Sequence, residues 1–141
     1  MYLARTPRPG ELSPGWRIVT LLTWIAVILA FAAVWNTSTQ LGLSTWWLGP
    51  RAQPQPRVVQ LSPFVAPVSM VLATINHVRW LGRWGLAAAG VLGFYGAIDI
   101  AGVTSLGALQ LLIAGLAAVV SIASMTGTYR KLPAAGDGTD G

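Results

Sequence analysis

Four apolar stretches dominate the pattern of hydrophobic and polar positions along this 141-residue chain. They cover residues 16–35, 58–77, 84–103 and 106–125. A helix needs about 20 apolar residues to cross a hydrocarbon core about 30 Å thick, and each stretch has that length. The pattern therefore predicts an all-α fold, an integral membrane four-helix bundle over residues 16–125, with no separate soluble domain.

Polar and Pro-rich segments separate the four stretches. Residues 1–15 predict an irregular N-terminal tail, and residues 36–57 predict a long loop that follows a first helix ending at Trp35. Residues 126–141 have little apolar surface to bury, so we expect a disordered C-terminal tail. Only residues 104–105 separate the last two stretches, which predicts a tight hairpin of two helices.

The second stretch contains two prolines. Ser62 followed by Pro63 has the pattern of an N-cap with proline at the first helical position, and residues 58–61 are expected to complete the span as an extended or a helical entry. Pro67 should bend this helix, and a hydroxyl such as that of Ser69 is expected to satisfy the carbonyl freed near Pro63. The hydroxyl groups in the apolar stretches are interpreted as bonding groups between helices: Thr20, Thr23, Ser62, Ser69, Thr74, Ser121 and Ser124. Thr20 and Thr23 could also bond back to carbonyls one turn earlier.

The distribution of charged residues predicts how the chain is oriented in the membrane. Only 9% of the residues are charged while 54% are hydrophobic, and the net charge is +5. Seven of the nine cations would lie on the side of the two chain ends, and Arg51 and Arg57 on the other. By the positive-inside rule, both tails are cytoplasmic, in a multi-pass protein of the cytoplasmic membrane. Cations beside membrane segments argue against a nucleic-acid partner, and the abundance of Ala, Gly, Arg and Trp suggests a bacterial source.

Aromatic and basic residues mark two candidate surfaces. Trp46 and Trp47 in the long loop suit the outer headgroup level, either as an anchor or as a docking surface for a partner. Between the second and third stretches, basic and aromatic residues alternate: Arg79, Trp80, Arg83 and Trp84. With Arg17, Arg130 and Lys131 they predict an inner rim that either anchors the chain in the membrane or binds anionic phospholipid at a specific site. On a continuous helix, the two Arg-Trp pairs would share one face.

Small residues recur every four positions in the third stretch, including Gly93 and Ala97. Such a stripe lets two helix backbones approach closely in lipid. It is expected to pack the third helix on the fourth, while the remaining faces could contact a second copy or another membrane subunit.

Asp99 is the one acidic residue within a stretch, so it is the main candidate for chemistry. It could carry protons or bind a cation, or it could reach outer-side water or pair with Arg51 or Arg57 as a structural group. His77 is the single histidine, and the chain has no cysteine, so no complete haem or metal site is predicted from this chain alone.

Catalytic motifs of the common hydrolase, metalloprotease and nucleotide-binding kinds are missing from the sequence. We therefore expect a protein that is not an enzyme and has no cofactor: a non-catalytic accessory or assembly subunit of a larger membrane complex. The alternative is a small homo-oligomeric transporter that uses Asp99. The small multidrug-resistance exporters are of comparable size, but they carry an essential glutamate in the first helix, where this chain has no acid.

Overall fold

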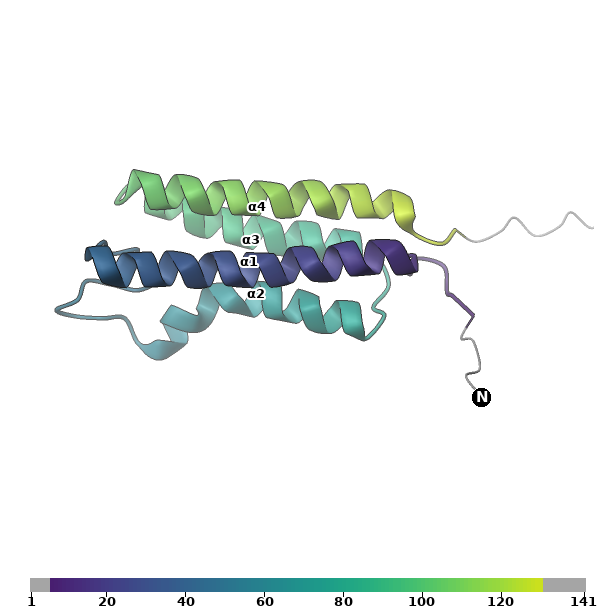
Figure 1. Cartoon of the computed structure of the whole chain (residues 1–141), viewed down its shortest axis with the longest axis horizontal. Coiled ribbons are helices and arrows are strands. Elements are labelled where there is room, and N and C mark those ends of the chain that lie inside the picture. Colours follow the sequence, from purple (N-terminus) through teal and green to yellow (C-terminus); the bar gives the residue numbers. More distant parts are fainter. Residues whose placement is uncertain (1–5, 131–141) are drawn as a thin grey trace, which may run out of the picture.

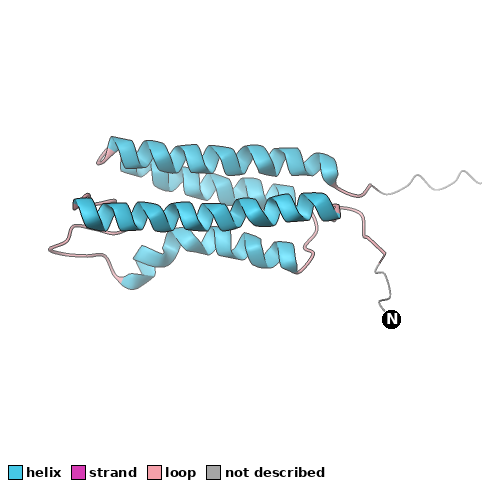
Figure 2. Cartoon of the chain, viewed as in Figure 1, coloured by secondary structure: helices cyan, strands magenta, loops and turns pink. Residues whose placement is uncertain are grey.

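The computed structural model describes residues 6–130, and within this range the chain is helical without a β-strand (Figure 2). One isolated antiparallel bridge joins Leu12 and Thr128. The helices are α1 (Pro14–Leu41), α2 (Arg57–Ile75), α3 (Leu81–Ile100) and α4 (Thr104–Ser124), followed by a short 3-10 helix, η1 (Met125–Gly127).

The four α-helices lie side by side with their long axes nearly aligned (Figure 1). The most extensive contact joins α3 and α4, while α1 packs on α2 and α4, and α2 also packs on α3. One end of this array carries the loop 42–56 and the turn 101–103, and we call it the loop end. The other, the terminal end, consists of residues 6–13, the link 76–80 and residues 125–130.

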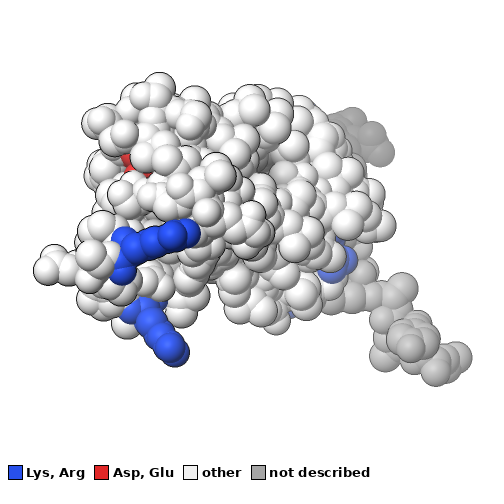
Figure 3. Space-filling view, turned by 60° about the vertical axis from the view of Figure 1, so that its left-hand side comes forward, with Lys and Arg blue, Asp and Glu red and all other residues white. Residues whose placement is uncertain are grey.

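Three helices are long and apolar enough to cross a membrane, judged by length and composition: α1, α2 and the run Thr104–Gly127. α3 has a similar length but is not among them. Arg83 and Asp99 near its two ends, together with its many glycines, lower its hydropathy. Large hydrophobic side chains are nevertheless exposed on all four helices. On the face shown in Figure 3, Lys and Arg lie toward the two ends and leave an uncharged surface between them.

The predicted end of the first helix at Trp35 is wrong, because α1 continues to Leu41. The polar residues after Trp35 remain helical and bond within the helix: Thr39 donates its hydroxyl to the Asn36 carbonyl at 2.8 Å. Gly42, with a left-handed φ of 69°, ends the helix. The hydropathy pattern showed where apolar surface ends, whereas helical structure continues until a residue favours another backbone conformation.

The N-cap predicted at Ser62 is wrong, and of the two alternatives for residues 58–61, extended or helical, the structure has the helical one. α2 begins at Arg57, so Pro63 and Pro67 both lie inside it, and Figure 1 shows its first part bent away from the rest. Because Pro63 has no N–H, it cannot bond to the carbonyl of Val59. The hydroxyl of Ser62 donates to that carbonyl instead, at 2.6 Å. The expected helper, Ser69, bonds to the Ala66 carbonyl.

Glycines bring α3 and α4 together. A side chain at Gly85 would collide with the Ser121 hydroxyl, and one at Gly96 would lie 2.9 Å from the Leu111 nitrogen. α3 begins at Leu81, earlier than predicted, and residue 104 already belongs to α4, so the predicted turn at residues 104–105 is wrong. Residues 101–103 form the turn instead.

Most hydroxyl groups do not join helices, which corrects that prediction. They donate to carbonyls of their own helix, three or four residues earlier. The Thr20 hydroxyl is buried and has no partner among the described residues. Ser62 alone among those predicted also accepts a bond from another helix.

Candidate functional site

Asp99 is the centre of a polar cluster at the loop end. Its side chain is 3% exposed. Oδ1 accepts a hydrogen bond from the backbone N–H of Trp46 at 2.8 Å, and Oδ2 accepts one from Nε2 of Gln110 at 2.7 Å. The carboxylate of α3 thus holds the loop and α4 together.

Local structure brings these groups into reach. Asp99 lies in the last turn of α3, and its backbone carbonyl accepts bonds from the N–H groups of Gly102 and Val103, which form the turn into α4. Gly107 then lies directly against the backbone at Ile100, where a side chain would not fit. This close approach lets Gln110, one turn further along α4, extend to the carboxylate.

The expected pairing of Asp99 with Arg51 or Arg57, or its contact with outer-side water, is wrong. Arg51 donates to the backbone carbonyl of Thr39 and, at 3.4 Å, to that of Gln40. These carbonyls belong to the last turn of α1, where the helix dipole favours a cation. The Asp99 carboxylate is thus hydrogen-bonded to neutral donors and the Arg51 guanidinium to neutral acceptors.

The two adjacent tryptophans of the loop have different surroundings. Trp46 is 36% exposed and packs on Tyr95 of α3, with ring centroids 5.0 Å apart. Trp47 is 0% exposed, and its ring meets those of Trp35 and Phe64 edge to face. Trp47 therefore belongs to the core of the loop end, and of the pair only Trp46 offers surface to lipid or to a partner.

Tyr95 and Gln110 are site residues that the sequence analysis missed. The Tyr95 hydroxyl donates to Oγ of Ser62 at 2.7 Å, and Ser62 in turn bonds to the Val59 carbonyl freed by proline. Gln110 is fully buried. Each is a polar group inside an otherwise apolar stretch, and this signal could have identified them.

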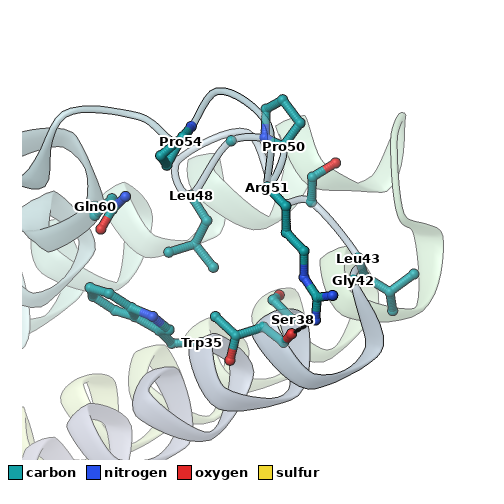
Figure 4. A pocket seen from close by; sticks show the side chains of 12 residues that line it. Trp35, Ser38, Gly42, Leu43, Leu48, Pro50, Arg51, Pro54 and Gln60 are labelled. Atoms are coloured by element: carbon teal, nitrogen blue, oxygen red, sulfur yellow. Dashed lines mark hydrogen bonds between the residues drawn. The ribbon is translucent and has the colours of Figure 1, made fainter.

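A cavity of about 270 Å³, lined by both polar and apolar groups, lies between the end of α1, the loop and the start of α2 (Figure 4). Arg51 extends along one wall toward the end of α1, while Leu48 and Trp35 lie on the opposite side. Ser38 also lines the cavity, and its buried hydroxyl has no partner within residues 6–130. Asp99 does not line this cavity.

Main-chain hydrogen bonds close the terminal end. The N–H of Gly10 bonds to the Tyr129 carbonyl at 2.9 Å, and the N–H of Tyr129 bonds to the Glu11 carbonyl at 3.0 Å. The N–H of Trp80 bonds to the Gly10 carbonyl at 2.9 Å. Residues 10–13 are therefore paired with the segment after α4. Residues 6–13 form no helix or strand, whereas residues 126–130, which lie in the predicted disordered tail, include the end of η1 and the bridge at Thr128. Residues 1–5 and 131–141 of those predicted tails lie outside the described residues.

The basic and aromatic link does not form the continuous helix on which its two Arg-Trp pairs would align. Trp80 has a left-handed φ of 58° and ends the link, so α3 starts as a new helix. Arg79 donates Nε to the Pro9 carbonyl at 2.8 Å, and the Arg83 guanidinium lies 4.8 Å from the Trp80 ring centre. Trp84 is 61% exposed on the first turn of α3. Arg79 and Arg83 thus have protein contacts of their own.

The predicted small-residue stripe lies partly away from the α3–α4 contact. Ala97 is exposed, and Gly93 is half-buried, with Ala114 at an ordinary distance from the space a side chain would occupy. The close contact runs through Gly82, Gly85 and Gly96. Of these, Gly96 lies on a second small-residue stripe that the sequence also predicts, at every third position from Gly90 to Gly96. Ala97 stays available to a neighbour.

No family model, curated protein or solved structure matches this chain. The function therefore has to be inferred from the chemistry of the loop end and the terminal end. At the loop end, the carboxylate holds neutral donors in place, and at the terminal end, Arg79 and Arg83 support the link.

Proposed function

We propose that this chain is a four-span protein of a bacterial cytoplasmic membrane, with its terminal end in the cytoplasm and its loop end outside. Three apolar helices support a membrane location, and α3 is of similar length and packs between α2 and α4. The described cations support the orientation: Arg8, Arg17, Arg79, Arg83 and Arg130 belong to the terminal end, against Arg51 and Arg57 at the loop end.

Within that membrane, the proposed role is a non-catalytic accessory or assembly subunit of a larger complex. The observation that carries this proposal is the use of Asp99 as a structural tie. Its two carboxylate oxygens accept hydrogen bonds from Trp46 and Gln110, its side chain is 3% exposed, and it lines none of five of the best-formed cavities in the described part of the chain. A carboxylate that carries a substrate or a proton needs a path to it, and this one is enclosed.

The exposed face of α3 is the surface proposed for the partner. Large apolar groups, Trp84 and Phe94, are exposed there at 61% and 64%. Between them, a side chain at Gly90 would meet open space, and Ala97 is exposed. Protruding rings with small residues between them provide a surface into which a partner helix can pack, as helix association in lipid requires.

Co-purification from native membranes in a mild detergent tests this role. We expect the tagged chain to recover a defined membrane partner, and Gly90→Leu to reduce that recovery several-fold because leucine fills the gap on α3. Gly115→Leu is the matched control, since Gly115 also faces open space but on α4. Recovery of a lone monomer, or equal loss with both variants, would contradict the proposal.

A transport assay in liposomes tests the alternative, a transporter that uses Asp99. Asp99→Asn keeps an acceptor for the Trp46 N–H and can donate to Oε1 of Gln110, which is buried without a partner. We therefore expect a folded protein with unchanged partner recovery. Solute or proton flux that wild type supports and Asp99→Asn abolishes would favour the transporter instead.

A further inference from the structure

Arg17 lacks the protein contacts that other cations of the terminal end have. Its Nε is buried and has no hydrogen-bond partner in the described part of the chain. Arg79, in contrast, bonds to the Pro9 carbonyl, and Arg83 lies over the Trp80 ring. A buried polar group without a partner destabilises a structure, more so when it is charged, so this guanidinium calls for an acceptor that the described chain does not supply.

Two cavities meet at Arg17. One, of about 210 Å³, lies between α1 and α2 and is walled mainly by the aliphatic side chains of Ile18, Leu21 and Ile75. Its one hydroxyl, on Thr74, already donates to the Met70 carbonyl. The other, of about 150 Å³, is polar, and its lining includes Glu11 and His77.

An apolar groove with a cation at its polar end matches the shape and charge of a membrane lipid. The groove would bury part of an acyl chain, since its walls are aliphatic. The guanidinium forms charge-assisted, often bidentate, bonds with phosphate oxygens. The terminal end as a whole is cationic, with five described arginines and Glu11 as its described acid, which favours a lipid of net negative charge over a zwitterionic one.

We propose that Arg17 binds the phosphate of an anionic phospholipid whose acyl chain lies in the groove between α1 and α2. This inference rests on the proposed membrane location, with the terminal end at a lipid headgroup layer. Within the inner rim predicted from the sequence, it centres the lipid site on Arg17, whose buried Nε lacks a partner in the described part of the chain, rather than on Arg79 and Arg83, which have contacts within the protein.

Thermal unfolding of the delipidated protein in detergent, with phosphatidylglycerol or phosphatidylcholine added, measures this binding. We expect phosphatidylglycerol to raise the midpoint and phosphatidylcholine to raise it less. Arg17→Gln should weaken the phosphatidylglycerol effect by about tenfold in lipid concentration, the equivalent of about 1.4 kcal/mol. Arg83→Gln is the matched control and should respond as wild type does.

Two further binding measurements define the ligand. Leu21→Trp narrows the groove without changing charge, and we expect it to weaken lipid binding as well. Inorganic phosphate at the same concentration should have no effect, because it has no chain to bury. Stabilisation by phosphate equal to that by lipid would overturn the lipid assignment and indicate a plain anion site.

Glu11 is the nearest alternative partner for Arg17, because both line the polar cavity. If it served Arg17 in place of lipid, Glu11→Gln and Arg17→Gln would destabilise the lipid-free protein equally and leave the phosphatidylglycerol response unchanged, and the proposal would be overturned. Labelling of single cysteines introduced at positions 8 and 51 of the cysteine-free chain tests the orientation separately. A wrong orientation would therefore be distinguishable from a missing lipid site.

Discussion

The loop end and the terminal end of this helix array are held together by different chemistry. At the loop end, the carboxylate of Asp99 bonds to the loop and to α4, and Tyr95 bonds to α2 through Ser62. At the terminal end, the backbones of residues 10–13, the link and residues 127–129 bond to one another.

The difference shows where charge is available for binding. Asp99 is the more deeply buried charge, yet each of its oxygens has a donor. Main-chain pairing at the terminal end engages no side-chain charge, and Arg17 keeps a buried nitrogen without a partner in the described part of the chain. A buried charge with a full set of partners indicates structure, whereas one without them indicates a ligand.

Replacing Asp99 with alanine should have the largest effect. It removes the acceptor for the Trp46 N–H and for the Gln110 amide and leaves both donors buried, so we expect a loss of about 3 kcal/mol in unfolding free energy. Thermal unfolding in detergent followed by circular dichroism measures it. Asp99→Asn should lose less than half as much, and equal losses would show that the negative charge matters more than the hydrogen bonds.

Gly10→Ala tests the terminal end. Gly10 has a φ of 87°, and a side chain there would lie 3.1 Å from the Trp80 ring. We expect a cost of about 1–2 kcal/mol, seen as faster amide exchange in residues 10–13 and in the link while the loop end is unchanged. Gly15→Ala is the control, because Gly15 is helical with open space around it and should be neutral or slightly stabilising. Faster exchange at both ends would show that they are coupled.

Arg51→Gln should have a smaller effect, confined to the last turn of α1. The guanidinium bonds to carbonyls there, so we expect a loss of about 0.5–1 kcal/mol and faster exchange at residues 36–41. Arg57→Gln, at the first residue of α2, is the control and should leave that turn protected. If the losses of unfolding free energy caused by Asp99→Ala and Arg51→Gln were strongly non-additive, the conclusion that the two charged groups act independently would be refuted.

Ser38→Ala should change stability by about 0.5 kcal/mol or less, because it removes a buried hydroxyl that has no protein partner. Ser62→Ala is the comparison, since it removes the partner of both the Tyr95 hydroxyl and the Val59 carbonyl and should cost about 1 kcal/mol. Chemical unfolding of both variants in the same detergent decides this. A larger loss at Ser38 would mean that its hydroxyl is bonded in the native state.

The sequence predicted the helical class and the number of helices, because a bilayer demands about 20 apolar residues per span. It predicted the boundaries of the helices less accurately. α1 passes through polar residues to Leu41, and α2 includes both prolines, because helix ends depend on backbone conformation and local hydrogen bonds rather than on hydropathy. For the site, the sequence singled out Asp99 but not its partners.

By itself, then, the sequence determined the apolar helices and the cations at their ends, as the cost of placing charge in lipid predicts, and it singled out the one acid within them as an exception to that cost. The tertiary structure alone decided that Asp99 meets Trp46 and Gln110, that Trp47 is buried, and that Arg17 lies between two cavities. These depend on how the helices are rotated against one another. That rotation is set by contacts between residues far apart in the chain, such as Gly85 of α3 against Ser121 of α4, which periodicity does not encode.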